Sequence, residues 1–176
     1  MTAATLNPTT LGIAADFVKS GVEKAGIPLT ETLEAYLSIT FARFLQSEIK
    51  VDLLTLRITR AMDARAPRDE MRGLADECLI ATALFGRRLR RAGAIRHYVA
   101  MGQMTYDAAN MTEQAYGFVH MRDVIASAAT GDEAEDPRVL FDQARAGSQT
   151  ARSELAGQNI VVGPWAKPAG NGLLWR

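Results

Sequence analysis

The stretch MRGLADECLIATALF, from Met71 to Phe85, decides the fold predicted for this chain. Its apolar residues recur at the three- and four-residue spacing of one helical face. From Leu79 onward the stretch is apolar nearly all round, so other helices have to cover it on several sides. It is too short for a bilayer, which needs roughly 20 apolar residues. We therefore expect a central core helix with four buried side chains: Leu79, Ile80, Leu84 and Phe85.

The composition is that of a soluble globular protein and gives no global sign of a charged partner. Of the 176 residues, 48% are hydrophobic and 23% are charged, and 20 basic residues balance 20 acidic ones. This length suits one domain that buries roughly 70% of its unfolded surface. A neutral balance does not favour nucleic acid, a membrane surface or an acidic substrate. Cys78 is the only cysteine, which excludes an intrachain disulfide and zinc sites with paired cysteines.

Signals for export, membrane insertion and common cofactors are missing from the sequence. The first residues, MTAATLNPTTLG, lack the basic and apolar regions of a signal peptide, and no apolar run reaches transmembrane length. We therefore expect a cytoplasmic protein without a membrane span. Neither a glycine-rich phosphate loop nor a nucleophile elbow occurs, and two histidines without a metal-binding spacing do not favour a catalytic metal. No cofactor or metal is expected.

The other helices are predicted from apolar stripes and from the signals at their ends. Asn7 and Thr30 are candidate N-caps, and Gly26 is a candidate C-cap. Gly102 lies within an apolar stripe, which predicts that a neighbouring helix approaches closely there. The prediction is an all-α, single-domain bundle of about six to eight helices over residues 1–157, followed by an extended tail over 158–176. The expected helices cover residues 8–25, 31–50, 53–64, 66–85, 95–109, 112–128, 138–146 and 148–155.

Several packing residues resemble the pattern of a family of small, uncharacterised, all-helical bacterial proteins. In that family an Asp-x-Cys-Leu stretch and a Phe precede an Arg-rich turn, a Tyr-Tyr pair, a Met-Gly and an Ala-Tyr. The likeness covers roughly residues 30–163, with His97 in place of the first tyrosine and Gly86 in place of a proline. It implies a helical fold and no established activity. The residues that carry it are Asp76, Cys78, Leu79, Phe85, His97, Tyr98, Gly102, Tyr106, Leu140, Phe141, Gly147, Ser148, Ala151 and Leu155.

Cys78 and Asp76 are the candidates for chemistry on the central helix. Cys78 lies on the apolar face, where packing as a small hydrophobe is favoured over a Cys–His pair with His97. Asp76 lies beside a wholly apolar segment, so its carboxylate is expected at the rim or paired inside. Arg72, one turn earlier, is the simplest partner, with Arg57 or Arg60 as alternatives. A satisfied ion pair that fixes helix register is favoured over a functional acid.

The densest charge in the chain is the connector formed by Arg87, Arg88, Arg90 and Arg91. These side chains suit a phosphate or an acidic partner. No aromatic residues interleave with them as they do in a single-strand binding platform. A solvated turn paired with acids of residues 133–136 is therefore favoured over a binding site.

The tail carries both tryptophans, Trp165 and Trp175. Tryptophan is enriched at binding hot spots, and Pro164 and Pro168 restrict the backbone on either side of the first one. We expect a strap that docks on its own domain or on a second copy, giving a homodimer. A disordered end with incidental tryptophans is the alternative.

Two classes of function follow. A non-enzymatic interaction or regulatory module, which uses helix faces and the tail on a protein partner or a second copy, is favoured because no acid, base and nucleophile come together. The alternative is a ligand-binding or enzymatic helical domain with a pocket near Asp76, Tyr98 and Tyr106. The candidate contact residues are Asp76, Arg87, Arg88, Arg90, Arg91, His97, Tyr98, Tyr106 and Trp165.

Overall fold

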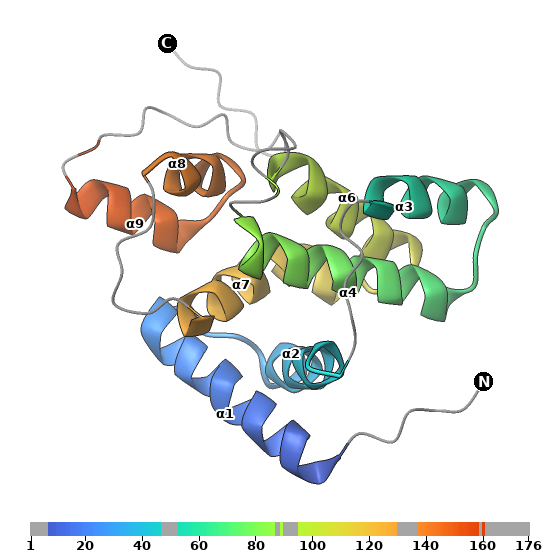
Figure 1. Cartoon of the computed structure of the whole chain (residues 1–176), viewed down its shortest axis with the longest axis horizontal. Helices are drawn as coiled ribbons and strands as arrows, with labels where there is room; N and C mark the ends of the chain where they lie inside the picture. The colour runs from blue at the N-terminus through green and yellow to red at the C-terminus, as the bar shows by residue number, and fades with distance from the viewer. Residues whose placement is uncertain are drawn as a thin grey trace.

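The computed structural model of this chain describes residues 7–46, 53–86, 89, 95–129, 137–158 and 160 (Figure 1). In these ranges eight helices occur and no strand, which confirms the predicted all-α class. The division into a domain over 1–157 and a tail over 158–176 stays a prediction. The helices are α1 (Pro8–Ala25), α2 (Glu31–Phe44), α3 (Leu54–Asp63), α4 (Arg68–Leu84), α6 (Ile95–Ala108), α7 (Thr112–Ala129), α8 (Pro137–Arg145) and α9 (Gln149–Gly157).

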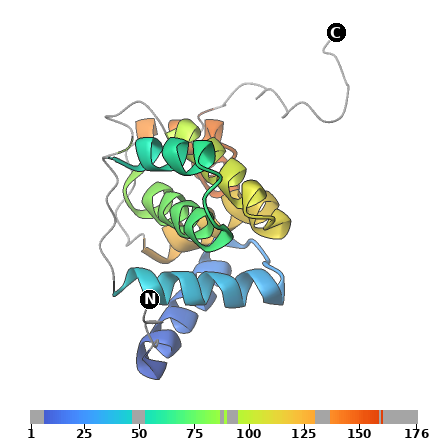
Figure 2. The ribbon, with the colours of Figure 1, turned by 90° about the vertical axis from the view of Figure 1, so that its right-hand side faces the viewer.

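Helix α4 is the central element, as its sequence predicts. It contacts α2, α3, α6 and α7. Helices α3 and α2 lie on opposite sides of it, with α1 beyond α2 (Figures 1 and 2). Leu79 and Ile80 are fully buried, but Leu84 and Phe85 are only partly buried, so the expectation for these two is wrong. The reason is that α4 ends at Leu84, and its last turn is covered less completely than its middle.

The predicted helix ends are set by local side-chain chemistry. The Asn7 side chain accepts a hydrogen bond of 2.9 Å from the Thr9 N–H, and the Thr30 hydroxyl accepts one of 3.2 Å from the Leu33 N–H. Gly26 closes α1 in the left-handed conformation, with φ of 63°, which costs glycine little. These contacts confirm all three caps.

Helix α2 is shorter than predicted. It ends at Phe44, before the expected Lys50, where the spacing of the backbone hydrogen bonds falls from four residues to three. The Gln46 N–H donates to the Arg43 carbonyl at 3.1 Å, three residues back, which closes the helix with a narrow turn. Residues 47–52 lie outside the described part of the chain.

Two glycines allow close packing between helices. A Cβ atom on Gly102 of α6 would lie 2.3 Å from Cε2 of Phe118 on α7, so the predicted close approach is confirmed. Gly21 of α1 plays the same part against α7, where a Cβ atom would lie 2.3 Å from the Val124 carbonyl oxygen. Side chains larger than hydrogen at either place would push α7 away from its neighbour.

Helices α8 and α9 lie against each other as a pair (Figure 1). They share a small apolar cluster of their own. The cluster consists of Leu140, Ala144, Ala151 and Leu155, with Phe141 and Ile160 packed against it. The Ser148 hydroxyl caps α9 by accepting from the Ala151 N–H at 3.1 Å. This pair is joined to the main bundle through α6 and α7.

Candidate functional site

Asp76 is held by two tyrosines from other helices. The hydroxyls of Tyr36 on α2 and Tyr106 on α6 both donate to Oδ1 of Asp76, at 2.5 and 2.6 Å. The two tyrosine rings meet edge to face, with centroids 6.1 Å apart. We call Asp76, Tyr36 and Tyr106 the carboxylate cluster. It ties α2, α4 and α6 together at one point.

Arginine has a smaller part in this cluster than the sequence predicts. Nε of Arg72 lies 3.9 Å from Oδ2 of Asp76, too far for a hydrogen bond but close enough for attraction between charges. Arg57 is engaged elsewhere, in a two-pronged ion pair with Glu77 at 2.6 and 2.7 Å. Asp76 is therefore held mainly by tyrosine hydroxyls and not by the expected ion pair.

Burial controls the protonation of the carboxylate cluster. It raises the pKa of Asp76, although the tyrosine hydroxyls and the charge of Arg72 act in the opposite direction. Burial and the neighbouring carboxylate also raise the pKa values of Tyr36 and Tyr106. Both tyrosines therefore keep their protons at neutral pH and serve as donors. Because the tyrosines do not release their protons at neutral pH, the cluster suits a structural role better than acid–base catalysis.

Cys78 and His97 do not form a pair. Cys78 is fully buried, and burial raises the pKa of its thiol, so little thiolate forms. His97 is exposed, and its Nε2 lies 3.2 Å from the Thr55 hydroxyl on α3. The His97 ring packs edge to face on Tyr98, which is itself buried and takes no part in the hydrogen bonds to Asp76.

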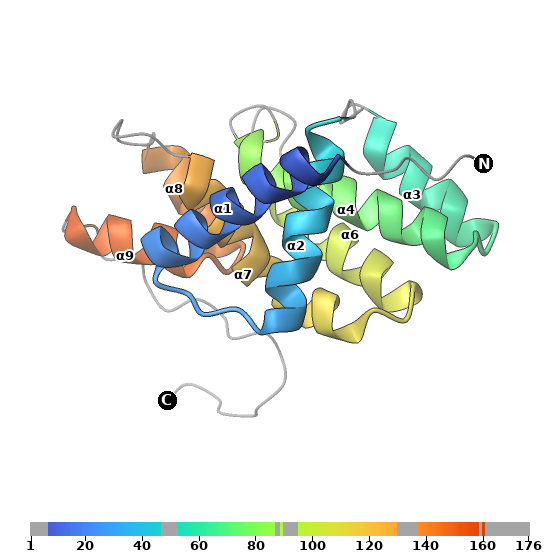
Figure 3. The same cartoon turned by 90° about the horizontal axis from the view of Figure 1, so that it is seen from below.

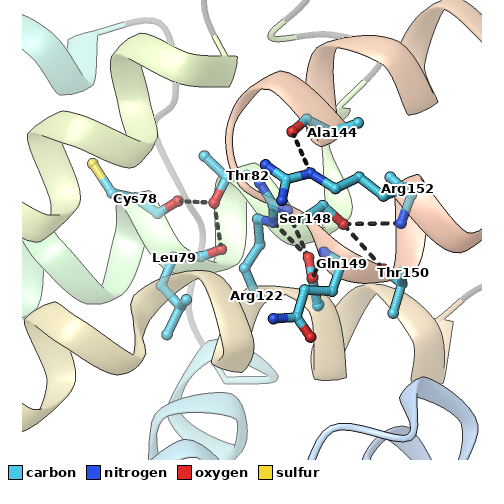
Figure 4. A network of polar contacts seen from close by, with 11 residues as sticks. Cys78, Leu79, Thr82, Arg122, Ala144, Ser148, Gln149, Thr150 and Arg152 are labelled. Carbon is cyan, nitrogen blue, oxygen red and sulfur yellow. Dashed lines mark hydrogen bonds and ion pairs between the residues drawn. The ribbon is translucent and has the colours of Figure 1, made fainter. Parts of the chain in front are cut away.

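A buried ion pair between neighbours on α7 escapes prediction from the sequence. Arg122 and Asp123 are each 1% exposed, and Nη2 and Nε of Arg122 donate to Oδ1 of Asp123 at 2.5 and 3.1 Å. Oδ2 of Asp123 accepts the Gln149 N–H at 3.0 Å, at the start of α9 (Figure 4). This carboxylate therefore fastens α9 to the bundle, where the helix dipole favours a negative charge. In the sequence, the only sign of this ion pair is that the charged residues Arg122 and Asp123 stand together between the apolar Met121 and Val124.

The remaining predicted contact residues lie outside the described part of the chain. These are the four connector arginines and the tail tryptophan: Arg87, Arg88, Arg90, Arg91 and Trp165. The acids expected to pair with the connector, at residues 133–136, lie outside it too. The predictions for these residues stay predictions.

The structure has a cavity at the far end of α1 from the N-terminus. Its volume is about 460 Å³, within the range of about 300–1,000 Å³ that is usual for small-molecule sites. It lies between the C-terminal end of α1 and helices α7, α8 and α9. We call it the α1–α9 cavity. Its wall mixes apolar side chains such as Ile27 and Leu140 with polar ones such as Ser127 and Gln149.

A second cavity, of about 670 Å³, lies between α3 and α4. Its charges are balanced, so it favours neither an anion nor a cation. Neither of the two cavities is lined by Asp76, Tyr98 or Tyr106. Three arginines and three acidic residues line the second one: Arg57, Arg60, Arg65, Asp69, Glu70 and Glu77.

The start of α1 crosses the end of α2 (Figure 3), and several apolar side chains lie on this crossing. Phe17 of α1 stacks on Phe41 of α2 with ring centroids 4.3 Å apart, and Phe44 packs on Phe41 at 5.8 Å. Ile13 and Leu45 lie one turn beyond the stacked pair, and they are 58% and 48% exposed. We call Ile13, Phe17, Phe44 and Leu45 the α1–α2 surface.

The described residues contain neither a group placed to bind a metal ion nor a helix suited to span a membrane. Among them, no group of three or more His, Cys, Asp or Glu residues is placed to hold a metal ion. None of their helices combines the length and the hydropathy that a membrane span requires.

No family model, curated protein or solved structure matches this chain. The resemblance to the family of small helical bacterial proteins therefore stays a prediction.

Proposed function

We propose that this protein is a non-enzymatic interaction module that associates with a second copy of itself through the α1–α2 surface. The observation that carries the proposal is the exposure of Ile13 and Leu45, each one helical turn from the packed rings of Phe17, Phe41 and Phe44. Aromatic rings that are already packed lose little conformational entropy on binding, which favours association. Exposed apolar side chains that gather in one patch are typical of binding surfaces.

Symmetry makes a second copy the natural partner. Soluble oligomers are most often dimers with two-fold symmetry, in which one patch meets the same patch on the partner. The α1–α2 surface comes from two crossing helices, so a two-fold axis through it would pack four helices together. A reversible dimer is the expected product, because the patch is small.

The ligand-binding alternative has less support. It places a pocket near Asp76, Tyr98 and Tyr106, but neither cavity described above has these residues in its wall. The Tyr106 hydroxyl moreover donates its hydrogen bond to the Asp76 carboxylate and not toward a ligand.

Sedimentation velocity over a wide concentration range tests the proposal. The wild-type protein should show a reversible monomer–dimer equilibrium. Ile13→Glu combined with Leu45→Glu should raise the dissociation constant at least ~10-fold, because a charge would have to be buried in the interface. Leu56→Glu is the matched control, since Leu56 is 46% exposed on α3, on the other side of α4. A protein that stays monomeric, or a dimer that Leu56→Glu weakens equally, would contradict the proposal.

A further inference from the structure

We propose that the α1–α9 cavity is the docking site for the chain's own C-terminal segment, residues 161–176, with the Trp165 side chain inserted into it. The cavity lies at the opposite end of α1 from the α1–α2 surface. The proposal therefore stands whether or not the protein dimerises. Three observations carry it: the wall of the cavity, the position of Ile160 and the length of chain that follows.

The wall of the cavity suits an indole ring. Ala25, Ile27 and Leu140 supply apolar surface for the ring. Ser127 and Gln149 supply side-chain oxygen atoms that can accept the indole N–H, which usually finds a partner when it is buried. The volume of about 460 Å³ leaves room for a tryptophan side chain and part of the backbone that carries it.

The chain turns back onto α9 at Ile160. The N–H of Ile160 donates to the Leu155 carbonyl at 2.9 Å, and the Ile160 side chain packs against the apolar cluster of α8 and α9. Glu154, the neighbour of Leu155, and Ala151, one turn earlier, both line the cavity. Ile160 therefore lies beside the helix whose first turns form one wall.

The length of the segment allows Trp165 to reach the cavity. Trp165 is five residue steps from Ile160, and a fully extended chain covers about 17 Å over that distance. This is enough to reach back along α9, in which Ala151 and Leu155 are only about 6 Å apart. It is too short to reach the α1–α2 surface as well, because Ile13 lies twelve residues, or about 18 Å, farther along α1 from Ala25. Pro164, next to Trp165, favours the extended backbone that a docked strap needs.

Tryptophan fluorescence reports on the segment alone, because both tryptophans of the chain lie in it. In the Trp175→Phe protein all tryptophan emission comes from Trp165. We expect this emission to be blue-shifted relative to the urea-unfolded protein and poorly quenched by acrylamide. Emission and quenching equal to those of the unfolded protein would overturn the proposal.

A cavity-filling variant locates the binding site. Ser153 is exposed on α9 and lines the cavity, so Ser153→Phe in the Trp175→Phe background should displace the indole and shift its emission to that of the unfolded protein. Ala156→Phe is the matched control, since Ala156 is also exposed on the same helix and does not line the cavity. Far-UV circular dichroism verifies that both variants keep their helices. A blue shift that survives Ser153→Phe, or that Ala156→Phe also removes, would place Trp165 elsewhere and overturn the proposal.

Dilution separates docking within one chain from docking between chains. The proposed arrangement predicts a Trp165 emission that does not depend on protein concentration. Emission that moves to longer wavelength on dilution would mean that the segment binds a second copy, and it would overturn docking within the chain.

Discussion

The hydroxyl of Tyr106 lies 2.6 Å from Oδ1 of Asp76, so α6 is bound to α4 by a hydrogen bond between a fully buried tyrosine and a carboxylate that is 14% exposed. Tyr36 donates to the same oxygen from α2 at 2.5 Å. A single carboxylate thus fixes the relative positions of three helices. The carboxylate cluster makes the interior of the bundle specific, since an apolar interface alone would tolerate slippage of one helix along another.

Removing the Tyr106 hydroxyl should destabilise the protein. Tyr106→Phe leaves the buried carboxylate with one donor fewer, and the expected loss is about 1–3 kcal/mol in the free energy of unfolding. Tyr36→Phe should cost less, because the partly exposed Tyr36 leaves a site that water can reach. Urea unfolding of both variants measures the difference. A Tyr106→Phe protein as stable as the wild type would show that this hydrogen bond does not stabilise the bundle.

Asp76 should make stability depend on pH. Its pKa in the folded protein is raised, so the native state holds this proton more tightly than the unfolded chain does. The contribution of Asp76 to stability is therefore greatest below pH ~4, near the ordinary aspartate pKa. It is lost as the pH rises through the raised pKa. Asp76→Asn does not titrate, so it should gain stability relative to the wild type as pH increases toward neutrality.

Urea unfolding at several pH values measures this trend, with Asp107→Asn, an exposed substitution on α6, as the control. A difference between wild type and Asp76→Asn that stays constant with pH, or that changes in the opposite direction, would show that burial does not dominate at Asp76.

Two glycine substitutions should have opposite effects. Gly102→Ala places a methyl group 2.3 Å from Cε2 of Phe118, whose ring is fully buried, and should cost roughly 1–3 kcal/mol. Gly73→Ala on α4 meets nothing within 4 Å and should stabilise the helix by up to about 1 kcal/mol. Thermal unfolding of the two variants compares them directly. Equal effects would mean that α6 and α7 are not packed as closely as described.

Cys78 should behave as an inert core residue. Its thiol is fully buried and its pKa is raised by burial, so a thiol reagent should label the native protein only as fast as the structure opens. Labelling should accelerate strongly in urea. Rapid labelling of the native protein, at the rate of an exposed thiolate, would contradict this.

The sequence predicts those features that depend on neighbours along the chain. Asn7 and Thr30 begin their helices and Gly26 ends one through contacts within four residues, and the burial of Leu79 and Ile80 follows from the apolar run in which they lie. Each of these contacts closes within one or two turns, so the local pattern contains the information.

The carboxylate cluster and the α7–α9 contact could not be predicted in this way. Tyr36 is 40 residues from Asp76, and Gln149 is 26 residues from Asp123. Which side chains meet over such distances depends on how the helices cross, and a helical period does not fix that angle. The prediction of Arg72 as the partner of Asp76 shows the limit, because local spacing favoured an arginine one turn away over tyrosines from two other helices.

Hydrogen exchange followed by mass spectrometry at low and high protein concentration tests the proposed interaction surface most directly. If two copies meet through the α1–α2 surface, amides at the start of α1 and at the end of α2 should become more protected as concentration rises. Peptides from α3 should exchange at the same rate throughout. Exchange that does not depend on concentration in α1 and α2, or protection that appears in α3 instead, would contradict the account.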